Sequence, residues 1–99
     1  MIEKKAQRRK GLVKVTFSIP IEWMDHGASV VGDFNDWDPT ATPLRKKGSV
    51  RTASVELEPG RVYAFRYLDT RGRWHDDPQA DDVRPNAVGG TDCVLDLRD

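Results

Sequence analysis

The chain has 99 residues, of which 37% are hydrophobic and 32% are charged. A chain of this length forms one compact domain and leaves little core for a catalytic cleft. Its 16 basic and 16 acidic side chains cancel, which excludes a global field that would attract nucleic acid or an anionic membrane.

No apolar run reaches the roughly 18 residues that span a bilayer, and the N-terminus lacks the apolar core of a signal peptide. The single cysteine, Cys93, rules out an internal disulfide. An apolar core without disulfides suits a reducing compartment. We therefore expect a soluble, cytoplasmic protein.

The first ten residues are strongly basic: against Glu3 they hold Lys4, Lys5, Arg8, Arg9 and Lys10. No aromatic residue interleaves with these charges, as it would in a segment that stacks on nucleic-acid bases. We expect residues 1–10 to be a flexible basic arm and residues 11–99 to form the domain.

Alternation of apolar and polar side chains, typical of half-buried strands, is the dominant pattern from there on. It predicts strands over residues 12–19 and 28–32, a short edge piece at 43–45, and a strand over 50–57. The turn sequence Pro59-Gly60 then predicts a hairpin to a strand over 62–68. A last strand covers 91–97, with Asp92, Val94 and Asp96 facing outward.

The inward positions of these strands define the expected core. It consists of Val13, Val15, Phe17, Val55, Leu57, Phe65, Tyr67, Cys93, Leu95 and Leu97. No window keeps a helical period. About six or seven short strands at roughly ten-residue spacing predict an all-β antiparallel sandwich of the immunoglobulin-like kind.

Two tryptophans follow strands in polar loops. Trp37 lies near the tip of the loop at 33–39, and Trp74 follows the turn at 69–73. Indole faces pack well on the C–H faces of a sugar ring, so the pair could form a sugar platform. Alternatively, each tryptophan plugs one end of the sandwich. Hydroxyl partners for a sugar would be Arg66, Asn35, Asn86 and Asp92.

Several motifs in order along the chain resemble carbohydrate-binding module family 48. They are Gly32-Asp33-Phe34-Asn35-Asp36-Trp37, Pro43-Leu44, Pro59-Gly60, Tyr63-Ala64-Phe65-Arg66-Tyr67 and Gly72-Arg73-Trp74-His75-Asp76-Asp77-Pro78. This family includes the N-terminal domains of isoamylase and glycogen branching enzyme and the glycogen-binding domain of the AMP-activated protein kinase β subunit. The resemblance implies an immunoglobulin-like, early-set sandwich.

The resemblance also implies a ligand and its contacts. In glycogen-binding members, the motif tryptophan matches Trp37, a lysine on the hairpin strand matches Arg66, and the tryptophan after the turn matches Trp74. Asp92 stands where an asparagine binds sugar. The implied partners are an α-1,4-glucan such as glycogen, starch or a maltooligosaccharide, and a glycogen-metabolising enzyme or another protein. The alternative is a structural or protein-interaction module that has lost carbohydrate binding.

The sequence shows little sign of a metal site or a catalytic site. The acidic loop at 33–38 lacks the glycine that a calcium loop requires at its sixth position, and His75 has no second histidine nearby, because His26 lies in a separate loop. Acidic pairs lie in turns rather than across a cleft. We therefore expect no metal, no cofactor and no enzymatic activity, and we interpret Cys93 and Trp23 as packing residues.

Overall fold

The computed structural model describes residues 2–7, 11–24, 27–86 and 89–98. Within these ranges nine strands and two short 3-10 helices are present, and no α-helix. The strands are β1 (Ile2–Gln7), β2 (Leu12–Pro20), β3 (Ala28–Gly32), β4 (Arg45–Lys47), β5 (Val50–Leu57), β6 (Val62–Asp69), β7 (Trp74–His75), β8 (Asp82–Pro85) and β9 (Thr91–Asp96). The 3-10 helices are η1 (Ile21–Met24) and η2 (Asp33–Asn35), and neither is long enough to cross a membrane.

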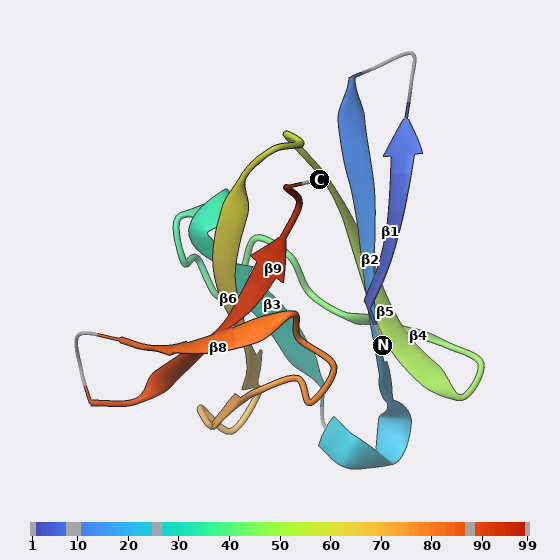
Figure 1. Cartoon of the computed structure of the whole chain (residues 1–99). Coiled ribbons are helices and arrows are strands. Elements are labelled where there is room, and N and C mark those ends of the chain that lie inside the picture. The colour runs from blue at the N-terminus through green and yellow to red at the C-terminus, as the bar shows by residue number, and fades with distance from the viewer. Residues whose placement is uncertain (1, 8–10, 25–26, 87–88, 99) are drawn as a thin grey trace.

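Two antiparallel sheets pack face to face, with the orders β1-β2-β5-β4 and β3-β6-β9-β8, and β7 pairs with β6 beyond the end of β9 (Figure 1). Immunoglobulin constant domains have the same orders, in which strands A, B, E and D face strands C, F and G. Strand β8 is an addition at the edge of the second sheet. The predicted all-β, immunoglobulin-like sandwich is confirmed.

The core forms between the two sheets from the predicted alternating positions. Phe17, Phe65 and Tyr67 are each 0% exposed, and their rings contact one another with centroid separations of 5.1–6.3 Å. The rest of the predicted inward set is buried or packs against this cluster, Cys93 included. Alternation alone therefore located the core, because each strand has one face against the other sheet.

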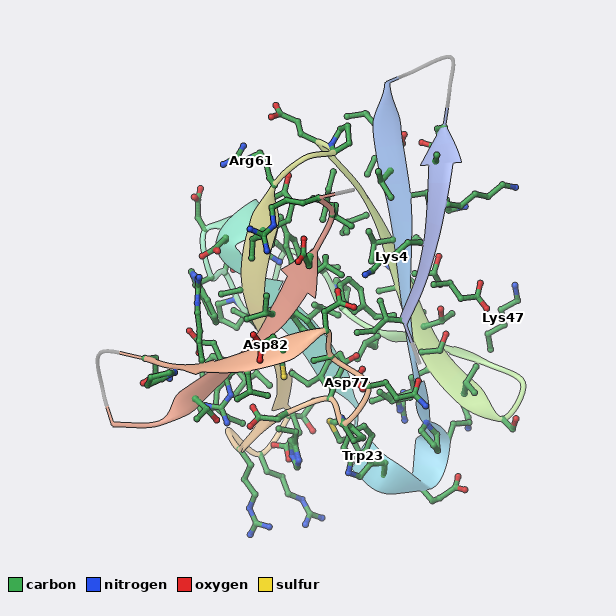
Figure 2. The ribbon with its side chains drawn as sticks, viewed as in Figure 1. Lys4, Trp23, Lys47, Arg61, Asp77 and Asp82 are labelled. Atoms are coloured by element: carbon green, nitrogen blue, oxygen red, sulfur yellow. The ribbon has the colours of Figure 1, made fainter. Side chains whose placement is uncertain are left out.

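The basic N-terminal segment differs from the expected flexible arm. Residues 2–7 form β1, which pairs along its whole length with β2. Lys4 Nζ reaches across to Oδ2 of Asp81, the residue before β8 of the opposite sheet, at 2.6 Å; Lys4 is labelled in Figure 2. An edge strand has one pairing neighbour and a solvated second edge, so its sequence can be polar and still pair. Arg8, Arg9 and Lys10 lie outside the described residues.

The predicted hairpin at Pro59-Gly60 is also wrong. Strands β5 and β6 lie in different sheets, so this turn is the corner at which the chain crosses the sandwich. The hydroxyl of Tyr63 donates a 3.0 Å hydrogen bond to the carbonyl of Glu58 across the corner, the tyrosine corner of immunoglobulin-like domains. A Pro-Gly turn between two alternating stretches does not distinguish a hairpin from such a corner.

Three further elements differ from the expectation. The edge piece lies at β4, residues 45–47, rather than at 43–45, while Pro43 makes an isolated bridge to Ser29 of the other sheet. Strands β7 and β8 had no alternating pattern long enough to predict them. Both lie at a sheet edge, where pairing by the backbone does not require apolar side chains.

Candidate functional site

An apolar layer lies on the outer face of the β3-β6-β9-β8 sheet, the face turned away from the core. The register places Val31, Ala64 and Val94 there, with Ala64 directly opposite Val94. Val94 points outward as predicted, yet all three are buried, at 0%, 1% and 7% exposed. Longer side chains must therefore cover this face.

One covering side chain is Arg84, from the edge strand β8. Its Nη2 lies 3.9 Å from Oδ2 of Asp33, which follows β3 on the far side of the sheet. Strands β9 and β6 lie between β8 and β3. The Arg84 side chain therefore extends across the outer face to make this contact, over the apolar layer.

Asp33 holds Trp37 on the same face. Strand β3 ends at Gly32 opposite Phe65, and the Asp33 carboxylate replaces the missing strand partner by accepting a 2.8 Å hydrogen bond from the backbone N–H of Ala64. Its other oxygen accepts a 3.1 Å hydrogen bond from Nε1 of Trp37. The indole is half-buried, with its polar edge fixed.

The side chain of Asn35 makes its hydrogen bonds within and beside the loop that precedes Trp37. Its Oδ1 accepts from the Gly32 N–H at 3.1 Å, and its Nδ2 donates to the carbonyl of Val30 and to Oγ1 of Thr42, both at 3.0 Å. A Cβ on Gly32 would lie 2.5 Å from the carbonyl oxygen of Ala64, which explains the glycine here. Asn35 thus shapes the loop with both of its donors.

The backbone at the tip of this loop is strained. Asp36 and Trp37 both have φ of 56°, in the left-handed region, which costs roughly 1–2 kcal/mol for each non-glycine residue. The Trp37 N–H donates to the Gly32 carbonyl at 3.0 Å. Strain that the surrounding structure maintains is common at binding sites, and here it fixes where the Trp37 ring lies.

Trp74 lies opposite Leu68 across the β6–β7 pair and is 45% exposed. The guanidinium carbon of Arg66 lies 5.6 Å from its ring centroid, a cation–π contact. Arg66 Nε donates a 2.8 Å hydrogen bond to Asp76 Oδ1, and Thr91 Oγ1 donates to Asp76 Oδ2 at 3.1 Å. The ring and the guanidinium are therefore held together in one arrangement.

Asn86 and Asp92 form a second polar pair. Asn86 Nδ2 donates to Asp92 Oδ1 at 3.1 Å, and Asn86 Oδ1 accepts from the Gly90 N–H at 3.0 Å. Asp92 lies opposite Arg84 in the β8–β9 pair, so it faces outward as predicted. Both side chains are partly exposed, so a ligand in solution can reach them.

The structure thus gathers five of the six predicted site residues on the outer face. Arg66 contacts Trp74, and Asn86 contacts Asp92. Trp37 is hydrogen-bonded to Asp33, whose carboxylate lies on this face. The side chain of Asn35 instead makes hydrogen bonds within its own loop. Sequence reasoning missed four members of this surface: Asp33, Asp76, Arg84 and Thr91. Asp33 and Asp76 lie inside the motifs at 32–37 and 72–78, and the sequence contains no other indication that they belong to this surface.

Trp23 and His75 lie apart from this face. The Trp23 ring centroid lies 6.2 Å from that of Tyr67 and 6.4 Å from that of His75, and Trp23 is 39% exposed. His75 Nε2 lies 2.8 Å from Oδ2 of Asp69. These contacts give both residues a packing or hairpin role, in line with the packing interpretation of Trp23.

No group of three or more potential metal ligands occurs in the described ranges, and His26 lies outside them. Burial raises the pKa of the Cys93 thiol to about 11, so the reactive thiolate is scarce at neutral pH. The outer face instead offers an exposed indole, fixed polar groups and paired charges. That chemistry suits a neutral ligand with both apolar C–H surface and hydroxyls.

Comparison of the chain with models of known protein families gives no match. Comparison with curated proteins gives none either.

Proposed function

We propose that this domain is a non-catalytic module that binds α-1,4-glucan on the outer face of the β3-β6-β9-β8 sheet. The observation that carries the proposal is the exposed Trp74 ring with Arg66 held against it. A half-exposed indole beside fixed hydrogen-bond donors is the arrangement that a glucose ring needs, because the ring stacks while its hydroxyls bond to the polar groups.

The charges on this face support a neutral ligand. Arg66 is paired with Asp76 at 2.8 Å, and Arg84 lies 3.9 Å from Asp33. Because each cation has a carboxylate beside it, the face has no excess field that would select an anion. The same pairings restrict the side chains before the ligand arrives, which lowers the entropy cost of binding.

The carboxylates of this face support binding rather than catalysis. Asp33 accepts hydrogen bonds from Ala64 and Trp37, and Asp76 accepts them from Arg66 and Thr91. A glycosidase needs two carboxylates about 5–10 Å apart that flank a bond, one of them free to give a proton. Asp33 and Asp76 are hydrogen-bonded to structural donors on a sheet face, so neither carboxylate suits the role of a proton donor or that of its catalytic partner. Incubation with amylose and glycogen should release no reducing sugar.

The test is a titration of the intact chain with maltoheptaose and with β-cyclodextrin, followed by tryptophan fluorescence and by amide chemical shifts. Binding should shift the amides of β6, β7 and β9 near Arg66 and Trp74. Trp23→Phe is the matched control, because it removes an indole away from this face and should leave the affinity unchanged. A chain that shows no binding to either sugar at about 1 mM contradicts the proposal.

A second candidate function is that of a structural or protein-interaction module, for example beside a glycogen-metabolising enzyme. It is favoured by the half-buried Trp37, whose Nε1 is bound to Asp33, and by Asn35, whose donors are used within its loop. In that case both features serve folding. The cytoplasm, where glycogen is stored, remains the proposed location for either function.

A further inference from the structure

One edge of β5 lacks a strand over much of its length. β2 pairs with β5 from Val50 to Leu57, whereas β4 pairs with residues 50–52 only. The chain before β4 turns to the other sheet, since the Thr42 carbonyl accepts from Val30 and the Leu44 N–H donates to Ala28. From residue 53 on, no strand in the described ranges lies beside this edge.

The open edge presents backbone hydrogen-bonding groups. Lys47 and Val50 close a two-residue turn, so Val50 exchanges its backbone hydrogen bonds with β4. Antiparallel pairing alternates from residue to residue, so Thr52 and Ser54 also direct their N–H and C=O groups away from β2. Thr52 meets Arg45 of β4, whereas Ser54 meets no strand there.

A groove of about 510 Å³ lies along this edge. Ser54 and Val55 form one side, Thr42 and Pro43 form the other, and Arg45 lies in its lining. The side chains are small, which leaves room for a second backbone. An extended segment placed here would continue the sheet from where β4 stops.

The charges beside the groove indicate what the segment contains. Arg45, Lys46 and Lys47 are all exposed, and none has a carboxylate within 4.0 Å in the parts of the chain that the structure describes. Figure 2 shows the labelled Lys47 on the hairpin at the outside of the molecule. The groove lining contains no acidic residue. Three adjacent unpaired cations favour an acidic partner.

We propose that an acidic, extended segment of a partner protein binds as an added strand along residues 53–55 of β5, with its carboxylates near the β4–β5 hairpin. Main-chain hydrogen bonds to the edge supply affinity, and the three cations select acidic sequences. No lining residue of this groove belongs to the glucan surface, so the two sites are independent.

The experiment uses the full chain and a blocked octapeptide of alternating Glu and Val, with a Lys-for-Glu peptide as the comparison. The acidic peptide should shift the amides of residues 52–56, and the basic peptide should not. Ser54→Pro removes the outward N–H but no backbone hydrogen bond to β2, and it should weaken binding at least about tenfold. Ser54→Ala loses the same 2.9 Å side-chain hydrogen bond to Thr16 but keeps the N–H, so it should not weaken binding. Thermal unfolding verifies that each variant is folded.

Reversal of the charges at Arg45, Lys46 and Lys47 to Glu should weaken acidic-peptide binding by about fivefold or more, and it decides the matter if Ser54→Pro does not fold. Equal binding of both peptides, no binding at about 1 mM, or shifts confined to another surface would each overturn the proposal. So would self-association in sedimentation that Ser54→Pro abolishes, since the occupant would then be a second copy. Maltoheptaose titrations of the same variants should be unchanged.

Discussion

The hydroxyl of Tyr67 donates a 2.6 Å hydrogen bond to the carboxylate of Asp77 inside the sandwich. Tyr67 is 0% exposed and Asp77 is 3% exposed. Burial and this hydrogen bond raise the pKa of Tyr67 far above its ordinary value, so the phenol is a protonated donor at neutral pH. The other Asp77 oxygen accepts from the Gln79 N–H at 2.8 Å. The pair ties the loop after β7 to the centre of the second sheet.

Tyr67→Phe should therefore destabilise the domain by about 1–3 kcal/mol, because it leaves a buried carboxylate oxygen without a donor. Urea unfolding followed by fluorescence measures the change. Tyr63→Phe is the comparison, since its hydroxyl bonds only a backbone carbonyl and its loss should cost about 0.5–1.5 kcal/mol. Equal losses would mean that the Asp77 carboxylate finds water or another donor.

Asp33→Ala should affect both stability and the outer face. The carboxylate bonds the Ala64 N–H and Trp37 Nε1, so its removal leaves a backbone donor unpaired and releases the indole, at a cost of about 1–3 kcal/mol. Asp33→Asn is the milder control, because its amide oxygen can still accept one of the two bonds. Thermal unfolding and amide shifts of residues 34–37 report the two effects separately.

The sequence predicted those parts of the fold that bury one face. Val15, Phe17 and Ile19 alternate with polar residues, and that period requires a strand against a core. β1 and β8 were not predictable in this way. Lys4 and Lys5 are as compatible with an arm as with an edge strand, because an edge strand is held by backbone pairing and by contacts such as Lys4 with Asp81.

The candidate site was predictable where a residue type is unusual for its position. An indole in a polar loop is conspicuous, and this pointed to Trp37 and Trp74. Arg84 has no such signal, because its place on the outer face depends on the β8–β9 pairing and on an ion pair with a residue 51 positions away. Asn35 resembles a ligand contact in sequence, and only the geometry shows that its donors are used within the loop.

Acid should destabilise the hairpin at residues 69–75. The hydrogen bond with His75, followed by those from the backbone N–H groups of Arg73 and Arg71, lowers the pKa of Asp69 from 3.8 to about 2. Since the folded pKa lies below the unfolded one, the stabilisation is present above about pH 4 and is lost as the pH falls towards 2. The difference in thermal midpoint between the parent chain and Asp69→Asn should shrink over this range. A difference that is constant from pH 6 to about 2 would contradict this assignment.

Substitution of Trp37 and Trp74 should distinguish an effect on glucan affinity from an effect on stability. Trp74→Ala removes an exposed ring whose one described ring contact is with Arg66, so stability should fall by less than about 1 kcal/mol. Trp37→Ala removes a half-buried ring and its bond to Asp33, and should cost about 1–2 kcal/mol. If both rings stack on glucose, each variant should bind maltoheptaose roughly 5- to 150-fold more weakly, from about 1–3 kcal/mol of stacking.

Arg66→Ala should remain folded and lose less affinity, because hydrogen bonds to neutral hydroxyls are partly replaced by water. Thermal midpoints and maltoheptaose affinities should be measured on these three variants and on Trp23→Phe. The variants can then be ranked once by stability and once by affinity. Glucan binding predicts that Trp74→Ala is among the most stable variants and among the weakest binders. A purely structural role predicts that the thermal midpoints fall steeply in both Trp37→Ala and Trp74→Ala, with no affinity in the parent chain to lose.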